Sequence, residues 1–190
     1  MSLDSNHEFG GLLAALADCE DDAARKQAEA HIWERYGTRG VAFVSDMCSF
    51  SRTTRAHGIC HFLGLIEHAR RIIAPEVLRH GGKLLKFEID NSFAFFSDVD
   101  SAVHCARDLN ARITETNHKR APEDRITIAI GIDHGDLLLI EDRDFFGDPV
   151  GEIVLAGLQR EVVERQHRDG RPACERAAIV SAGEDGAADA

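Results

Sequence analysis

The spacing of hydrophobic residues in the first half of the chain predicts helices that alternate with strands. A loosely amphipathic pattern over 12–36 predicts an N-terminal helix. The apolar run Val41–Val44 predicts a buried strand, and Asp46 follows at its end. Apolar residues then recur at three-and-four spacing over 51–73, which predicts a long helix that Pro75 kinks or restarts.

The second half of the chain predicts an antiparallel sheet with helices on one face. The expected elements are strands over 83–89 and 92–96, a helix over 99–118, and strands over 126–132 and 137–140. Asp90 and Asn91 are the expected turn between the first two of these strands. The order β-α-β-β-α-β-β predicts an α+β fold with a ferredoxin-like β-α-β-β-α-β core, preceded by the N-terminal helix.

Length and composition agree with one globular domain. The chain has 190 residues, of which 44% are hydrophobic and 29% charged, which is enough apolar material for one core. We expect an N-terminal helical extension over 1–37 and a folded domain over 38–180. The small, acidic residues of 181–190 predict a disordered tail.

The charge of the chain restricts its partners. With 33 acidic and 22 basic side chains the net charge is −11, which opposes binding of nucleic acid or an anionic membrane surface by the chain as a whole. A phosphate-bearing ligand must therefore be bound locally, by metal ions or backbone amides. Five scattered cysteines, without close pairs, are typical of reduced thiols, and no signal peptide or apolar span is visible. We therefore expect a cytoplasmic protein.

Two carboxylates provide the first candidate chemistry. Asp46 ends the first strand and Asp90 lies in the turn between the next two, so both should lie at neighbouring strand ends. Carboxylate oxygens are the ligands that hard divalent cations prefer. The alternative is structural: Asp90-Asn91 is favourable turn chemistry, and Asp46 is then a turn or helix cap.

Four segments in order resemble the class III adenylate/guanylate cyclase catalytic domain. They are Phe43-Val-Ser-Asp-Met-Cys-Ser-Phe-Ser51, Gly81-Gly-Lys-Leu-Leu-Lys-Phe-Glu-Ile-Asp90, Ile130-Gly-Ile-Asp-His-Gly135 and Asp144-Phe-Phe-Gly-Asp-Pro-Val150. The resemblance implies a ferredoxin-like core that forms a head-to-tail homodimer, with active sites at the subunit interface. It also implies conversion of ATP to 3′,5′-cyclic AMP and pyrophosphate.

The resemblance assigns catalytic and metal-binding roles. Asp46 and Asp90 resemble the two metal-binding aspartates, and the Met47 carbonyl would be a backbone ligand. The implied cofactors are two divalent ions, Mg²⁺ or Mn²⁺. One lowers the pKa of the ribose 3′-hydroxyl and the other holds the triphosphate.

The resemblance also implies a nucleotide site. The amides that would bind phosphate at the start of the following helix are those of Cys48, Ser49, Phe50 and Ser51. Lys86 and Asp144 resemble the pair that reads the purine. An ammonium only donates, which suits adenine N1, and a carboxylate only accepts, which suits the adenine amino group, so the pair favours ATP. The alternative is that Lys86 is a solvent-facing strand residue and Asp144 an ordinary loop carboxylate.

Several positions depart from the family pattern. Gly151 and Leu155 stand where the family has an asparagine and an arginine, the latter bracing the transition state. A second alignment, in which 151–156 is a later strand, also lacks those two side chains. Ser49 and Ile89 replace glycines. The alternative function is therefore a catalytically degenerate cyclase fold that acts as a nucleotide-binding or dimerising regulatory module.

Overall fold

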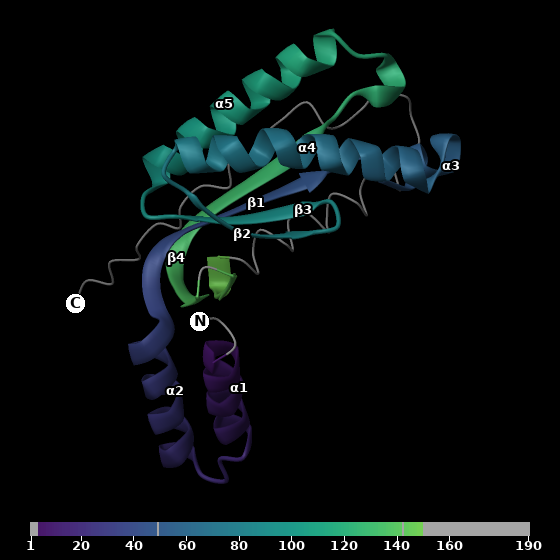
Figure 1. Ribbon diagram of the computed structural model, residues 1–190. Helices are drawn as coiled ribbons and strands as arrows, with labels where there is room; N and C mark the ends of the chain where they lie inside the picture. The colour runs from purple at the N-terminus through teal and green to yellow at the C-terminus, as the bar shows by residue number, and fades with distance from the viewer. Residues whose placement is uncertain (1–3, 49, 142, 150–190) are drawn as a thin grey trace, which may run out of the picture.

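The computed structural model describes residues 4–48, 50–141 and 143–149, which form one sheet with helices on one face and a helix pair that projects from its end (Figure 1). The elements in chain order are α1 (Asp4–Ala17), α2 (Asp22–Tyr36), β1 (Gly37–Met47), α3 (Phe50–His57), α4 (Ile59–Arg79), β2 (Lys83–Glu88), β3 (Asn91–Phe96), α5 (Val99–His118), the 3₁₀ turn η1 (Pro122–Asp124), β4 (Ile128–Ile140) and β5 (Asp144–Phe146). The tail expected over 181–190 lies outside the described residues.

The sheet has the strand order β2-β3-β1-β4-β5, and every neighbouring pair is antiparallel. Its first four strands have the order of a ferredoxin-like fold, with α4 following β1 and α5 following β3. The predicted α+β class and ferredoxin-like core are confirmed. Two expected strands, 126–132 and 137–140, are one continuous strand, β4, because Gly135 stays paired with Gly40 in the ladder of β1.

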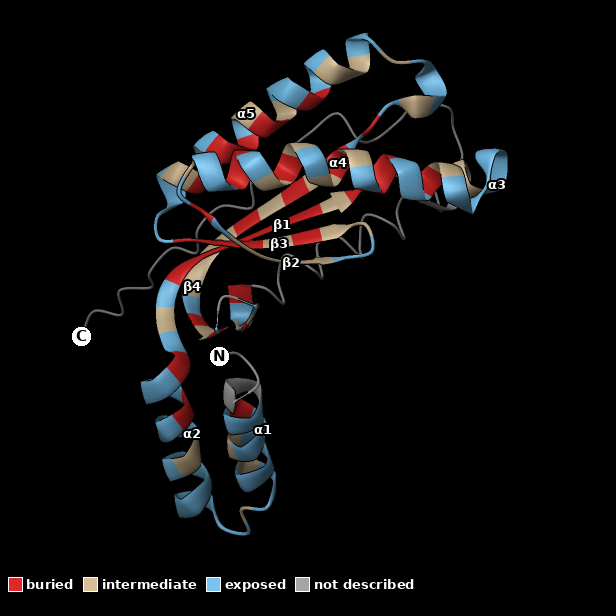
Figure 2. Cartoon of the chain, in the orientation of Figure 1, coloured by how far each residue is buried: buried red, intermediate tan, exposed pale blue. Residues whose placement is uncertain are grey.

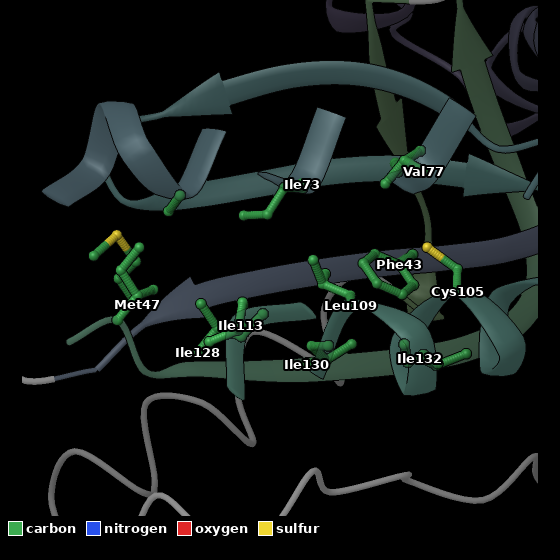
Figure 3. Packing of buried hydrophobic residues seen from close by; sticks show 14 of the residues in the cluster. Phe43, Met47, Ile73, Val77, Cys105, Leu109, Ile113, Ile128, Ile130 and Ile132 are labelled. Atoms are coloured by element: carbon green, nitrogen blue, oxygen red, sulfur yellow. The ribbon is translucent and has the colours of Figure 1, made fainter. Parts of the chain in front are cut away.

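Helices α4 and α5 lie side by side across one face of the sheet (Figures 1 and 2). The alternation of β1 and β4 directs Phe43, Ile130 and Ile132 toward these helices, where they pack against residues such as Ile73 and Leu109 (Figure 3). All five are at most 4% exposed. This main core fixes the sheet, and with it the strand ends that carry the candidate site.

The helix expected over 51–73 is divided by Gly58 and not by Pro75. Gly58 has a φ of 86°, a left-handed conformation that glycine adopts without steric cost, and α3 ends immediately before it. Helix α4 begins at Ile59 and continues through Pro75 to Arg79. The prediction of a restart at Pro75 is therefore wrong.

The N-terminal extension is a pair of helices and not one helix. Asp21 caps α2 by accepting a hydrogen bond from the Ala24 amide at 2.7 Å, which separates α2 from α1. The two helices project from the far ends of β1 and β4, well away from α4 and α5 (Figure 1). A small cluster that contains Phe9, Tyr36 and Ile140 joins the pair to β4.

The sequence also predicts reduced cysteines and no membrane-spanning segment. Cys19, Cys60 and Cys105 are free thiols, as expected for them. Among the described helices, none combines the length and the apolar character needed to cross a bilayer.

Candidate functional site

The candidate site lies on the sheet face opposite α4 and α5, which we call the distal face. Its apolar lining is a separate cluster of buried residues: Ala42, Val44, Phe95, Leu137 and Phe145. Successive side chains of a strand point to opposite faces. Asp46, two residues after Val44 in β1, therefore shares the distal face.

The structure brings Asp46 and the turn that carries Asp90 to adjoining strand ends. Asp46 is in register with Asn91 of β3, and the Met47 amide donates to the Asp90 carbonyl at 3.3 Å. Both aspartates are half-buried. Two carboxylates and a neighbouring backbone carbonyl form a set of hard oxygen donors, which fits a magnesium or manganese site in chemistry.

The turn itself differs from the expected Asp90-Asn91 turn. Its two residues are Ile89 and Asp90, because Asn91 already belongs to β3. Ile89 has a φ of 51° and is 68% exposed, an unusual state for a β-branched residue. The family pattern has glycine at this position, which adopts this backbone conformation without strain.

Helix α4 holds this turn from the other face of the sheet. The Arg70 guanidinium donates through Nη2 to the Ile89 carbonyl at 2.9 Å, and its carbon lies 5.1 Å from the centre of the Phe87 ring. This hydrogen bond helps to stabilise Ile89 in its strained conformation. The position of Asp90 consequently depends on a residue of α4.

A bulge in β2 determines where Lys86 lies. Leu84 is opposite Ala94 and Lys86 is opposite Phe93, so the intervening Leu85 has no partner of its own in β3. Without the bulge, Lys86 would share the face of Leu84, which packs against the main core. With it, Lys86 lies on the distal face, 4.9 Å above the Phe93 ring.

Lys86 forms an ion pair with Asp144, the other residue of the expected purine-reading pair. Its Nζ donates to Asp144 Oδ2 at 2.9 Å and lies 2.7 Å from Glu88 Oε1. Burial lowers the pKa of the ammonium, but the hydrogen bonds to Glu88 and Asp144 outweigh it and leave the pKa raised. Lys86 is therefore a permanent cation, and the alternative of a solvent-facing lysine is wrong.

This ion pair joins the two opposite edges of the sheet. Lys86 belongs to β2 and Asp144 to β5, the first and last strands in the sheet order. They meet because the long β4 is strongly bent and brings β5 below the distal face (Figure 1). The rings of Phe93 and Phe145 lie 6.2 Å apart between their centres, on the same side of the sheet.

The expected phosphate-binding amides are only partly described. The Cys48 amide donates to the Thr127 carbonyl at 2.9 Å, so it is committed within the protein and does not fit the expected role. Ser49 lies outside the described residues. Phe50 and Ser51 begin α3, where the first backbone amides have no acceptor in the helix. The positions of Gly151 and Leu155 also lie outside the described residues.

Sequence reasoning missed Glu88 and Arg70. Glu88 follows Lys86 by two residues in a strand, which places both on the same face, so the spacing contained this signal. Arg70 gave no such signal because its contact with the turn depends on how α4 crosses the sheet.

A second acidic cluster among the described residues lies far from the distal face. Ligand atoms of Glu76, His80 and Asp108 all lie within 4.8 Å of one another, between α4 and α5. Two arginines already pair with the buried Glu76 carboxylate: Arg79, and Arg112 at 3.0 Å. With both carboxylate oxygens engaged by cations, this cluster is an ion-pair network around the buried Glu76.

Solved structures identify the fold. The chain matches 117 of their chains. An adenylate/guanylate cyclase/hydrolase from Silicibacter pomeroyi is 25% identical with a TM-score of 0.54, over 72% of this chain and 84% of that one. A bacterial light-regulated adenylyl cyclase is 21% identical with a TM-score of 0.57, over 69% and 72%. The catalytic core of a rhodopsin-guanylyl cyclase with converted specificity, in complex with ATPαS, is 18% identical with a TM-score of 0.52, over 63% and 72%.

No protein-family model and no curated protein matches the sequence. The ferredoxin-like sheet with helices on one face defines an α+β domain. More narrowly, the fold is that of the class III nucleotide cyclase catalytic domain, which confirms the resemblance of the four sequence segments.

Proposed function

We propose that this protein is a class III nucleotide cyclase that converts ATP to 3′,5′-cyclic AMP and pyrophosphate in a head-to-tail homodimer. The observation that supports the proposal is the placement of Asp46, at the end of β1, beside the β2–β3 turn that carries Asp90. The separate meeting of Lys86 and Asp144 on the same face of the sheet supports it. The proposal includes a cytoplasmic location, which cell fractionation tests.

Asp46, Asp90 and the Met47 carbonyl are the proposed ligands of two divalent ions. The ions supply Lewis acidity to the ribose 3′-hydroxyl and neutralise the triphosphate. In the reaction the 3′-oxygen bonds to the α-phosphorus and the bond to the bridging β-phosphate oxygen breaks. Pyrophosphate leaves and the hydroxyl proton passes to solvent. The task of the two aspartates is to hold these groups in line.

Lys86 and Asp144 are proposed to bind the adenine edge. The ammonium donates to N1 and the carboxylate accepts from the 6-amino group, whereas guanine presents the opposite pattern at both positions. In the free protein the two side chains bond to each other, so each is already oriented toward the place of the base. Glu88 keeps Lys86 protonated when the base separates the pair.

The proposed phosphate contacts are the amides at the start of α3. The first turn of a helix presents unpaired N–H groups and the positive end of the helix dipole. The remaining candidates there are Phe50 and Ser51, together with Ser49. A local site of this kind is needed in a chain with a net charge of −11.

A regulatory module with the cyclase fold is the second candidate. The residues Gly151 and Leu155 favour it, because neither reproduces the asparagine and arginine of the family pattern. Loss of a cation that stabilises the transition state costs orders of magnitude in rate without preventing nucleotide binding.

One assay separates the two candidates. The purified full chain is incubated with ATP or GTP and Mn²⁺, and cyclic nucleotides are quantified by mass spectrometry. Asp46→Asn and Asp90→Asn test the site, and Asp22→Asn, on the exposed surface of α2, is the matched control. Cyclic AMP from the wild type and the control alone supports the enzyme. Metal-dependent ATP binding without product supports the module, and absence of both refutes both candidates.

A further inference from the structure

A second candidate binding site lies in the outer groove between α4 and α5. The two helices meet near Glu76 and diverge toward the N-terminal end of α4 (Figure 1). A cavity of about 430 Å³ opens between them, lined from α4 by His68, Arg71, Ile72 and Pro75, and from α5 and its C-terminal turn by Arg112, Glu115, Thr116, Lys119 and Arg120. This volume lies within the usual range for small-molecule sites.

The charge of this groove opposes the charge of the protein. Four cations line it, Arg71, Arg112, Lys119 and Arg120. The first three pair with the carboxylates of Glu67, Glu76 and Glu115, which leaves one positive charge in excess. The whole chain has a net charge of −11. Because these cations come from two helices that pack against each other, they form a local positive surface on an acidic protein, which attracts anions.

The arginines are held in place without using all of their donors. Arg71 bonds through Nε to Glu67 at 2.9 Å, Arg112 through Nε to Glu76 at 3.0 Å, and Arg120 through Nε to a backbone carbonyl at 2.8 Å. Each guanidinium has five N–H donors, and the Nη donors take no part in these bonds. A guanidinium fixed in this way offers the paired donors that match phosphate oxygens.

His68 supplies a further group without a partner. Its Nε2 is buried and has no hydrogen-bond partner among the described residues. Burial lowers the pKa of this imidazole, and the charges of Arg120 and Arg71 lower it further. An unpaired polar atom at the edge of a cavity is satisfied when a ligand or water enters.

We propose that this groove is a second anion site, which binds a small molecule that carries adjacent phosphate groups. The phosphates bind between the guanidinium groups of Arg71, Arg112 and Arg120, near His68. Ile72 provides apolar contact for the rest of an organic ligand. The groove is on the opposite side of the sheet from the distal face, so this site is separate from the proposed nucleotide cyclase site.

The test measures binding by titration calorimetry, with pyrophosphate and ADP as probes, in low salt and EDTA. EDTA removes the divalent ions on which the proposed cyclase site depends. The result of this binding measurement therefore does not depend on whether the cyclase proposal is correct. Tighter binding of ADP than of pyrophosphate identifies an organic phosphate as the ligand, and the reverse order identifies inorganic polyphosphate. We expect either probe to bind with a Kd below about 1 mM.

Two variants with the same change in net charge locate the site. Arg71→Gln with Lys119→Gln removes two exposed cations from the groove, and Arg25→Gln with Lys26→Gln removes two exposed cations from α2. We expect the first pair to weaken binding by about tenfold or more and the second to leave it nearly unchanged. Equal weakening in both pairs overturns the proposal, because it indicates only a dependence on total charge.

A measurement on the wild type guards against a variant that does not fold. Amide chemical shifts recorded during the pyrophosphate titration should change within 68–75 and 112–120. Shifts concentrated at Asp46, Asp90 or the start of α3 overturn the proposal. So does the absence of binding by either probe up to about 1 mM.

Discussion

Substitution of Glu76 by glutamine tests whether the network between α4 and α5 is structural. Glu76 is 2% exposed, and its carboxylate pairs with Arg79, with Arg112 at 3.0 Å and with His80 at 3.3 Å. Glutamine keeps the shape but removes the charge and places an amide N–H₂ group against one of these donors. A hydrogen bond to a charged group contributes about 1.5–3 kcal/mol, so we expect Glu76→Gln to lower the free energy of unfolding by about 2–4 kcal/mol.

The measurement is urea unfolding followed by circular dichroism at neutral pH. The same loss should lower the melting temperature by about 4–16 °C for a chain of this size. Glu67→Gln is the matched control, because Glu67 lies on the same helix and pairs with Arg71 at 2.9 Å while 55% exposed. An exposed pair of this kind contributes about 0.5 kcal/mol or less. Equal effects of the two substitutions would refute the reasoning. Stabilisation of the wild type by added zinc would indicate a metal site instead.

Three further predictions concern single residues. Asp98 caps α5, and the backbone hydrogen bond from Ser101 is the main reason that its pKa is lowered. The stability that Asp98 contributes is therefore present above its unfolded pKa near 3.8 and is lost as the pH falls through its folded pKa. The melting temperature of the wild type should therefore exceed that of Asp98→Asn at pH 6, with a difference that disappears in acid; a difference independent of pH contradicts this. Burial raises the pKa of Cys105 to about 12, so about one thiol in 10⁴ is ionised at pH 8. A thiol reagent should therefore label the exposed Cys60 and leave Cys105 unlabelled until the protein unfolds. Ile89→Asn should raise the stability by about 1 kcal/mol, because asparagine tolerates the positive φ of 51° better than isoleucine does; a loss of stability would show that the turn is not strained.

The order of elements could be predicted from the sequence because hydrophobic spacing determines local structure. The helix expected over 99–118 coincides with α5, Val99–His118, since Asp98 and the polar residues around His118 mark both of its ends. The adjacency of Asp46 and the Asp90 turn also followed, because the ferredoxin-like order makes β1 and β3 neighbours. These features depend on periodicity and topology alone.

Other features depend on tertiary contacts that periodicity does not contain. The bulge at Leu85 reverses the face on which Lys86 lies, and simple alternation would have placed this lysine toward the main core. The bend in β4 that brings Asp144 to Lys86 is equally invisible in a one-dimensional pattern. The helix break was expected at Pro75, but it occurs at Gly58, because the left-handed backbone of this glycine ends α3.

The most direct test of the nucleotide site is a crystal structure with Mn²⁺ and a non-hydrolysable ATP analogue, in which anomalous scattering locates the metal. We expect two manganese ions about 4 Å apart, bound by the carboxylates of Asp46 and Asp90 and by the triphosphate. Manganese bound elsewhere, with these two carboxylates directed to different sides of the protein, would contradict the account.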